Sequence, residues 1–222
     1  MGRRLRSLAA GLLLALVVGT PAVVADELVL EGSTTVMPLS GRLARGFARY
    51  SPDTQVRVQG GGSGQGIAAL IEARAHIANS SRFLTAQEIE RATAAGVFPV
   101  PFRIARDCIL PIVHKSNRLR DLSLDQLRAI FSGEIANWKE LGGADLPVVA
   151  VSRKTGSGTF DVWRQVVMRN MPVSSGLRRA SSSGEVVLAV SGERGAIGYI
   201  GLGHLNASVK PLRVEGVMGS LR

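Results

Sequence analysis

The sequence predicts an α/β fold that is divided into two lobes. Short apolar runs alternate with stretches in which apolar residues recur every three or four positions, as strands and helices do when they alternate. In several places a turn rich in glycine and hydroxyl side chains lies between a predicted strand and the helix that follows it. The passage over 98–114 is long, extended and interrupted by prolines. Alternation favours largely parallel sheets, and the extended passage predicts a crossing from lobe I (26–106) to lobe II (107–222).

The first 25 residues have the pattern of a secretory signal peptide. Three arginines (Arg3, Arg4 and Arg6) precede an apolar run over 8–18, and small residues lead up to Ala25. The apolar run is short for a membrane span, so we expect cleavage before Asp26 and a periplasmic or secreted protein. A retained N-terminal anchor is the alternative.

Composition narrows the classes of partner. The chain has 222 residues and a formal charge of +10, which invites anions, nucleic acid or acidic membranes. Aromatic residues make up only 5% and the basic residues are scattered, so we expect no nucleic-acid binding. The single cysteine, Cys108, lies in an apolar run and is predicted to be a small core residue. The three histidines lack metal-ligand spacing, so neither a metal nor a cofactor is expected: His76, His114 and His204.

Lobe I is predicted to contain three units of strand, turn and helix. The strands are expected at 27–30, 55–59 and 76–78, and the helices begin after the turns at 31–35, 60–66 and 79–82. Ser33 is the predicted N-cap of the first helix, whose apolar residues repeat from Val36 to Tyr50. Thr85 and Glu88 predict a capping box for the third helix.

Lobe II is predicted to continue the alternation. Ser123 and Gln126 form a second capping box, and a glycine-punctuated loop over 131–143 carries a tryptophan that looks buried, Trp138. Strands are expected at 108–113, 147–152 and 196–200, and helices at 123–130, 161–168 and after the serine-rich cap at 181–183.

The turn over 153–160 is the strongest candidate for a binding site. It stands between an apolar strand and an amphipathic helix, where unpaired helix amides and the positive end of the macrodipole favour an anion. Glycines allow close approach, the hydroxyls of Ser157 and Thr159 add donors, and Arg153 offers a planar charged group. The glycine run at 60–66 fits neither a nucleotide-binding fingerprint nor a nucleophile elbow.

Several motifs together resemble the periplasmic phosphate-binding proteins (PstS type) of bacterial phosphate importers. They occur in the family's order over nearly the whole mature chain: 32–38, 62–64, 78–82, 131–143, 153–159 and 195–203. The resemblance implies a two-lobed periplasmic-binding-protein (type II) fold that closes on one oxyanion. By position it implies these phosphate contacts: Thr34, Thr35, Ser63, Ser81, Arg153, Ser157, Gly158 and Thr159.

The resemblance further implies a monomeric, non-enzymatic binding protein that delivers inorganic phosphate to an ABC permease. Other tetrahedral oxyanions are left open, because Ser81 stands where many members have an aspartate. A C-terminal return segment, which the family usually places against lobe I, is expected to be missing, and its absence predicts an exposed apolar patch there. The alternative function is an oxyanion-binding module without transport, such as a sensor, an adhesin or a truncated remnant.

Overall fold

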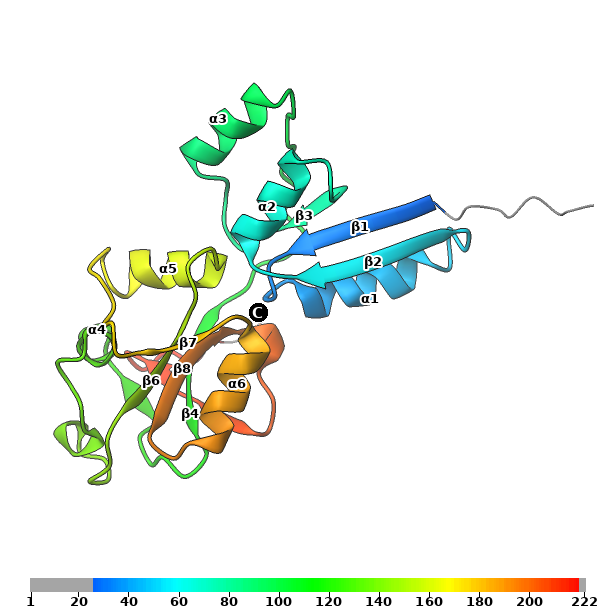
Figure 1. Ribbon diagram of the computed structural model, residues 1–222. Coiled ribbons are helices and arrows are strands. Elements are labelled where there is room, and N and C mark those ends of the chain that lie inside the picture. Colours follow the sequence, from blue (N-terminus) through cyan, green and yellow to red (C-terminus); the bar gives the residue numbers. More distant parts are fainter. Residues whose placement is uncertain (1–25, 220–222) are drawn as a thin grey trace, which may run out of the picture.

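The computed structural model describes residues 26–219, so the predicted signal peptide lies outside the described residues. The N-terminal part is built on a three-stranded sheet in the order β2-β1-β3, and all of its pairs are parallel. Its elements are β1 (Asp26–Gly32), α1 (Met37–Phe47), β2 (Thr54–Gly60), α2 (Ser63–Ile71), β3 (Ile77–Asn79) and α3 (Ala86–Ala94). In Figure 1 these elements form the blue to green half of the molecule.

The C-terminal part is built on a five-stranded mixed sheet in the order β7-β6-β8-β4-β9. Strand β4 is antiparallel to both of its neighbours, whereas β6 is parallel to β7 and β8. The strands are β4 (Ile109–His114), β6 (Val149–Arg153), β7 (Arg178–Ala180), β8 (Ala196–Gly201) and β9 (Val209–Pro211). The short strands β5 (Asp121–Leu122) and β10 (Arg213–Val214) form a separate parallel pair.

Helices pack on this second sheet (Figure 1). They are α4 (Leu124–Ser132), α5 (Gly158–Val166) and α6 (Ser183–Gly192), with 3-10 turns η1 (Trp138–Leu141) and η2 (Leu202–His204). The predicted capping boxes at Thr85 and Ser123 are present. Among residues 26–219, no helix is long and apolar enough to cross a membrane.

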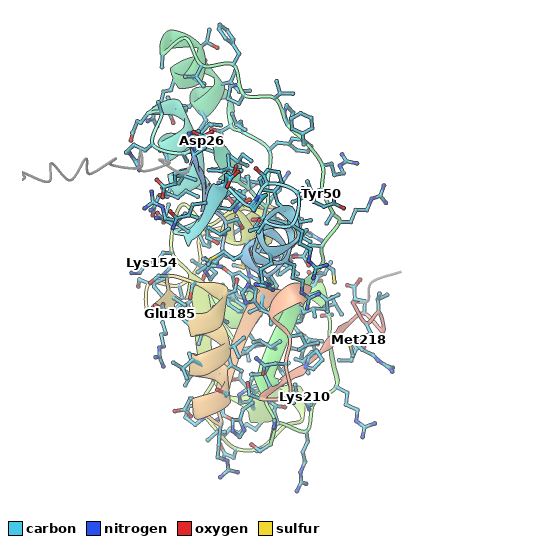
Figure 2. All side chains as sticks on the ribbon, turned by 90° about the vertical axis from the view of Figure 1, so that its right-hand side faces the viewer. Asp26, Tyr50, Lys154, Glu185, Lys210 and Met218 are labelled. Atoms are coloured by element: carbon cyan, nitrogen blue, oxygen red, sulfur yellow. The ribbon has the colours of Figure 1, made fainter. Side chains whose placement is uncertain are left out.

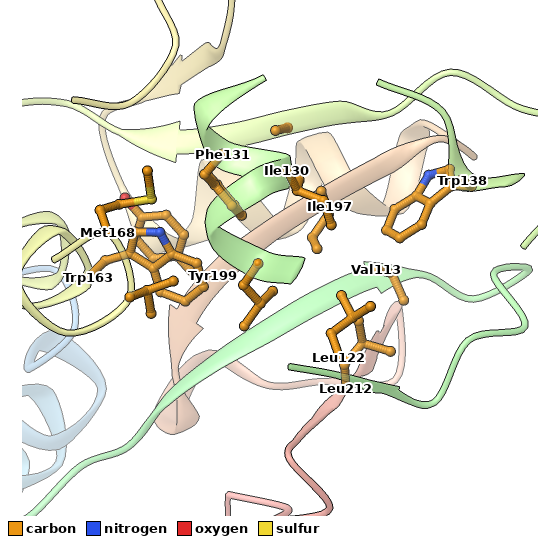
Figure 3. Close-up of a cluster of buried hydrophobic side chains, with 13 residues drawn as sticks. Val113, Leu122, Ile130, Phe131, Trp138, Trp163, Met168, Ile197, Tyr199 and Leu212 are labelled. Carbon is orange, nitrogen blue, oxygen red and sulfur yellow. The ribbon is translucent and has the colours of Figure 1, made fainter. Parts of the chain in front are cut away.

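The larger core lies under the second sheet (Figure 3). Phe131, Trp163 and Tyr199 pack against one another, and the last two rings stack with centroids 4.2 Å apart. Trp138 is buried as predicted, and its indole nitrogen donates to the carbonyl of Gly195 at 2.9 Å. This core fixes β6 and β8 rigidly, which matters because β6 ends in Arg153.

The N-terminal part has much less core and an exposed apolar face. On α1 and just beyond it, Leu43 is 52% exposed and Tyr50 is 88% exposed (Figure 2). Four apolar side chains on the segment over 98–104 are also exposed: Phe98, Val100, Phe102 and Ile104. The structure therefore confirms that apolar side chains are exposed on this part of the molecule.

Two local predictions are wrong. Val36, and not Ser33, is the N-cap of α1, because the chain makes an extra turn after β1 before the helix starts. Cys108 is only half-buried, since it lies at the edge of β4 where the chain crosses between the sheets. The extended passage does carry the chain from the first sheet to the second; within the described residues this crossing happens once, over 97–108, and no strand forms there.

Candidate functional site

Four helix N-termini meet at the junction between the N-terminal and C-terminal parts of the molecule. The turn between β1 and α1 brings Thr35 to Thr159 at the start of α5, and their hydroxyl oxygens are 2.6 Å apart. The first turn of α2 lies against the same loop, because the amide of Gly64 donates to the carbonyl of Gly156 at 3.0 Å. The N-terminus of α6 contacts the turn between β1 and α1 through Ser183, whose amide donates to the hydroxyl of Thr34. Each such terminus presents free amides and a partial positive charge.

A group of serine hydroxyls lines the N-terminal side of this junction. Ser81 follows β3, and its hydroxyl accepts from Ser33 at 3.1 Å and lies 3.3 Å from that of Ser63. The amide of Ser81 also donates to the Ser63 hydroxyl. Gly158 faces this group from the other part of the molecule, where a methyl group would collide with both Ser63 and Ser81. The two parts of the molecule therefore approach each other closely at these residues.

Arg153 is the cation of the site. It ends β6, it is 2% exposed, and its guanidinium donates to the Ser183 hydroxyl at 3.1 Å and to the Ser181 carbonyl at 3.0 Å. Within residues 26–219 no carboxylate pairs with it, and its Nε has no partner. Burial lowers the pKa of Arg153 from its ordinary value. A buried cation without a counter-ion is costly, and an anion bound beside it removes that cost.

Tyr199 fixes the position of Arg153. Its hydroxyl accepts the backbone N–H of Arg153 at 3.2 Å and lies 2.9 Å from the hydroxyl of Ser152. The ring is held in the core by the stack on Trp163. Two neighbouring strands therefore share one buried hydrogen-bonded group directly behind the cation.

Ser183 is a member of the cluster that the sequence did not indicate. It is the first residue of α6 and fully buried, and its amide donates to the Thr34 hydroxyl at 3.3 Å. Its own hydroxyl lies between Arg153 and Thr34. The serine-rich run at 181–183 predicted only a helix cap, which Ser182 provides. Three hydroxyl residues in a row before a helix, as at 33–35, are the signal in the sequence from which this member could have been found.

The predicted site residues can now be placed. Those that the structure brings together, directly or through Ser183, are Thr34, Thr35, Ser63, Ser81, Arg153, Gly158 and Thr159. The remaining one, Ser157, is buried nearby, but its hydroxyl caps α5 by accepting from the amide of Phe160 at 3.3 Å. Ser157 therefore shapes the turn and points its hydroxyl at its own helix.

A second arginine, Arg82, joins the two parts at the edge of the cluster. Its guanidinium donates to Asp161 of α5 at 2.8 Å and to both carboxylate oxygens of Glu88 at 2.7 and 2.8 Å. Hydrogen bonding to Glu88 raises the pKa of Arg82. Burial acts to raise the pKa of Glu88, but hydrogen bonds from Arg82 and Thr85 outweigh it, and the pKa lies below its ordinary value. Arg82 is thus fully paired, unlike Arg153.

The arrangement suits a small anion. Hydroxyls, helix amides and one cation surround the junction, and within residues 26–219 no group of three or more His, Cys, Asp or Glu side chains is placed to hold a metal. A tetrahedral oxyanion has no apolar surface and must exchange its water for donors of this kind.

Comparison with known proteins defines the class. A family model for a PBP superfamily domain matches residues 18–216, and the chain belongs to that superfamily. Its relatives include phosphate-binding proteins of the PstS type. The chain is 33% identical over 192 residues to the phosphate-binding protein PstS of Bacillus subtilis, covering 86% of this chain and 62% of that one. It is 30% identical to PstS of Borreliella burgdorferi, covering 82% and 65%.

Solved structures agree on the fold. One from Clostridium perfringens, described as a candidate phosphate ABC transporter substrate-binding protein with bound phosphate, is 36% identical and superimposes with a TM-score of 0.79. That match covers 87% of this chain and 77% of the other. An ABC-type phosphate transport receptor from Vibrio cholerae gives a TM-score of 0.64 at 29% identity. The chain spans between 58% and 65% of the length of the first curated relatives.

Proposed function

We propose that this protein captures inorganic phosphate between lobe I (26–106) and lobe II (107–222). The observation that carries the proposal is Arg153, which is a buried cation with no carboxylate partner among the described residues. The proposed contacts are those predicted from the sequence, to which we add Ser183. The predicted contacts are Thr34, Thr35, Ser63, Ser81, Arg153, Ser157, Gly158 and Thr159. Ser157 acts through its capping of α5.

The proposed contacts come from both sides of the junction. Ser63 and Ser81 belong to the first part of the chain, whereas Arg153 and Thr159 belong to the second. An anion that hydrogen-bonds to both sides holds them together, excludes water and thereby strengthens each contact. Binding and closure are then one event, and the ligand stabilises the closed form by mass action.

The proposal also includes a role in phosphate transport. We infer that the protein works outside the cytoplasm as a monomer and passes phosphate to an ABC permease, which the likeness to the Vibrio cholerae transport receptor supports. A catalytic role is disfavoured because, among residues 26–219, no carboxylate or imidazole hydrogen-bonds to a hydroxyl of the cluster. A base so placed is what activates a hydroxyl nucleophile.

Titration calorimetry tests the capture step. The protein is freed of anions by dialysis against chloride buffer and titrated with phosphate, and one site per chain with a matching rise in melting temperature is expected. No heat and no thermal shift would contradict the proposal. Delivery is tested separately by phosphate uptake into vesicles that contain the permease, with the protein added outside.

A further inference from the structure

We propose that His204 is a positioning residue of the phosphate site, which holds the turn between β1 and α1 in the orientation that binds the anion. The inference rests on the proposed function and adds a residue to it. His204 is the last residue of η2, and its Nε2 lies 2.7 Å from the carbonyl oxygen of Thr34. The two residues are 170 positions apart in the chain, so the contact joins the C-terminal part to the N-terminal part at the site.

The contact fixes which nitrogen of the imidazole carries a proton. A backbone carbonyl has lone pairs and no proton, so Nε2 of His204 is the donor. The hydrogen bond therefore selects a form of the ring that is protonated on Nε2, and it excludes the neutral tautomer whose proton is on Nδ1. Another side chain that offers an N–H at this place can replace the imidazole in this role.

The segment that carries the imidazole is held in place from both sides. The amide of Leu202 is shared between the carbonyl of Cys108 and a carboxylate oxygen of Asp107, each at 3.1 Å. At the end of β8, a methyl group on Gly201 would collide with the side chain of Thr35. The imidazole therefore reaches the turn between β1 and α1 from a fixed base that already lies against this turn.

The orientation of the Thr34 carbonyl decides where the next amide points. The peptide bond is trans, so its C=O and its N–H point in opposite directions, and the N–H of Thr35 points away from His204. Within residues 26–219 this N–H has no acceptor, which leaves it available to an anion. A peptide turned the other way presents its carbonyl oxygen in place of the N–H, and the oxygen repels an anion.

The same turn carries two of the proposed phosphate contacts. The hydroxyl of Thr34 accepts from the amide of Ser183 at 3.3 Å, and the hydroxyl of Thr35 lies 2.6 Å from that of Thr159. Together with His204, these bonds fix the turn through its backbone as well as its side chains. A turn that is ordered before the anion arrives loses less entropy on binding, so His204 raises the affinity for phosphate.

Calorimetric titration with phosphate tests the proposal with two substitutions at one position. His204→Phe keeps a flat ring and removes the N–H, so we expect phosphate affinity to fall by roughly three- to tenfold, the worth of one hydrogen bond. His204→Gln places an amide N–H at a similar reach and should restore the affinity to within about twofold of the parent. The matched control is His114→Phe, because the ring of His114 bonds to Ser116 and should not affect phosphate binding.

NMR of the unaltered protein gives a readout that needs no variant. The imidazole nitrogens should show the proton of His204 on Nε2. The amide proton of Thr35 should move downfield when phosphate is added, because a hydrogen bond to a charged acceptor is short and polarises the proton. In His204→Phe this movement should be smaller, which a loss of packing alone would not produce.

The outcomes separate the inference from the proposed function. If the parent binds phosphate and His204→Phe binds it equally well, the inference is overturned while the proposed function stands. The same holds if His204→Gln is weakened as much as His204→Phe, or if phosphate leaves the Thr35 amide unmoved. Should neither variant fold, a proton on Nδ1 of His204 in the parent would overturn the inference, and a proton on Nε2 with a moving Thr35 amide supports it. If the parent binds no phosphate, the proposed function fails and the inference fails with it.

Discussion

At the scale of single residues, Gly158 shows how closely the two sides of the site approach. It is the first residue of α5 and faces the hydroxyls of Ser63 and Ser81, with no room for a methyl group. A side chain here acts on closure and not on the folding of either part, because alanine is a better helix former than glycine.

Gly158→Ala is therefore expected to weaken phosphate binding by about tenfold or more while leaving the melting temperature of the ligand-free protein nearly unchanged. Calorimetry and thermal melting measure the two effects. Gly46→Ala in α1 is the control, since nothing lies within 4 Å of the added methyl. If Gly158→Ala binds phosphate with the affinity of the parent, the two parts do not need to approach as closely as these contacts indicate, and this account of Gly158 is wrong.

Ser183 tests whether the fourth helix terminus takes part. Ser183→Ala removes one partner of Arg153 and one of Thr34, so we expect phosphate affinity to fall by roughly three- to tenfold, the worth of one hydrogen bond. Ser191→Ala on the same helix is the control, because its hydroxyl bonds only to the carbonyl of Leu188. If both variants bind phosphate alike, Ser183 has no part in the site.

At the scale of elements, Arg82 ties α3 to α5 through two carboxylates. The pKa of Glu88 is lowered in the folded protein, so its contribution to stability is present above the ordinary glutamate pKa and is lost as the pH falls through the folded value. The link therefore weakens only in acid. Near neutral pH it holds the edge of the site in place.

Glu88→Gln is expected to lower the free energy of unfolding by about 1–2 kcal/mol at neutral pH, because Arg82 loses half of its paired charge. Denaturant unfolding at neutral and acidic pH checks this. The difference between variant and parent should shrink toward zero in acid, as protonation removes the same charge from the parent. A difference that stays constant with pH would contradict the ion-pair account.

At the scale of the whole molecule, the N-terminal part carries an exposed apolar face beside a small core. Phe98 and Phe102 are 74% and 82% exposed, and α1 adds Leu43 and Phe47.

Replacing both exposed rings (Phe98→Ser with Phe102→Ser) is therefore expected to change stability by no more than about 0.5 kcal/mol while reducing the binding of a hydrophobic dye. Phe131→Ser, in the buried cluster, should cost about 3 kcal/mol or more. Dye fluorescence and denaturant unfolding separate the two cases. Equal destabilisation by the two changes would mean that the exposed rings pack in solution.

The sequence predicted the turns of the site well, because each turn is a local pattern of strand, glycine and hydroxyl. The local patterns did not predict how distant turns meet, and only the family resemblance implied that these turns share one site. Thr34 and Ser183 are 149 residues apart in the chain, and only the tertiary fold places them together. The same limit explains α1, whose 3.6-residue repeat predicted an amphipathic helix although Leu43 and Phe47 remain exposed. Periodicity reveals an apolar face but not what covers it.

The central claim is that Arg153 is the cation that binds phosphate, and a single titration series tests it most directly. Phosphate is titrated by calorimetry into the parent, into Arg153→Met, and into the control Arg118→Met, which removes the same charge from an exposed position. We expect Arg153→Met to bind at least ~2 kcal/mol more weakly, about thirtyfold, and Arg118→Met to match the parent. Melting confirms that the variants are folded. Equal phosphate affinity in Arg153→Met and the parent would contradict the account.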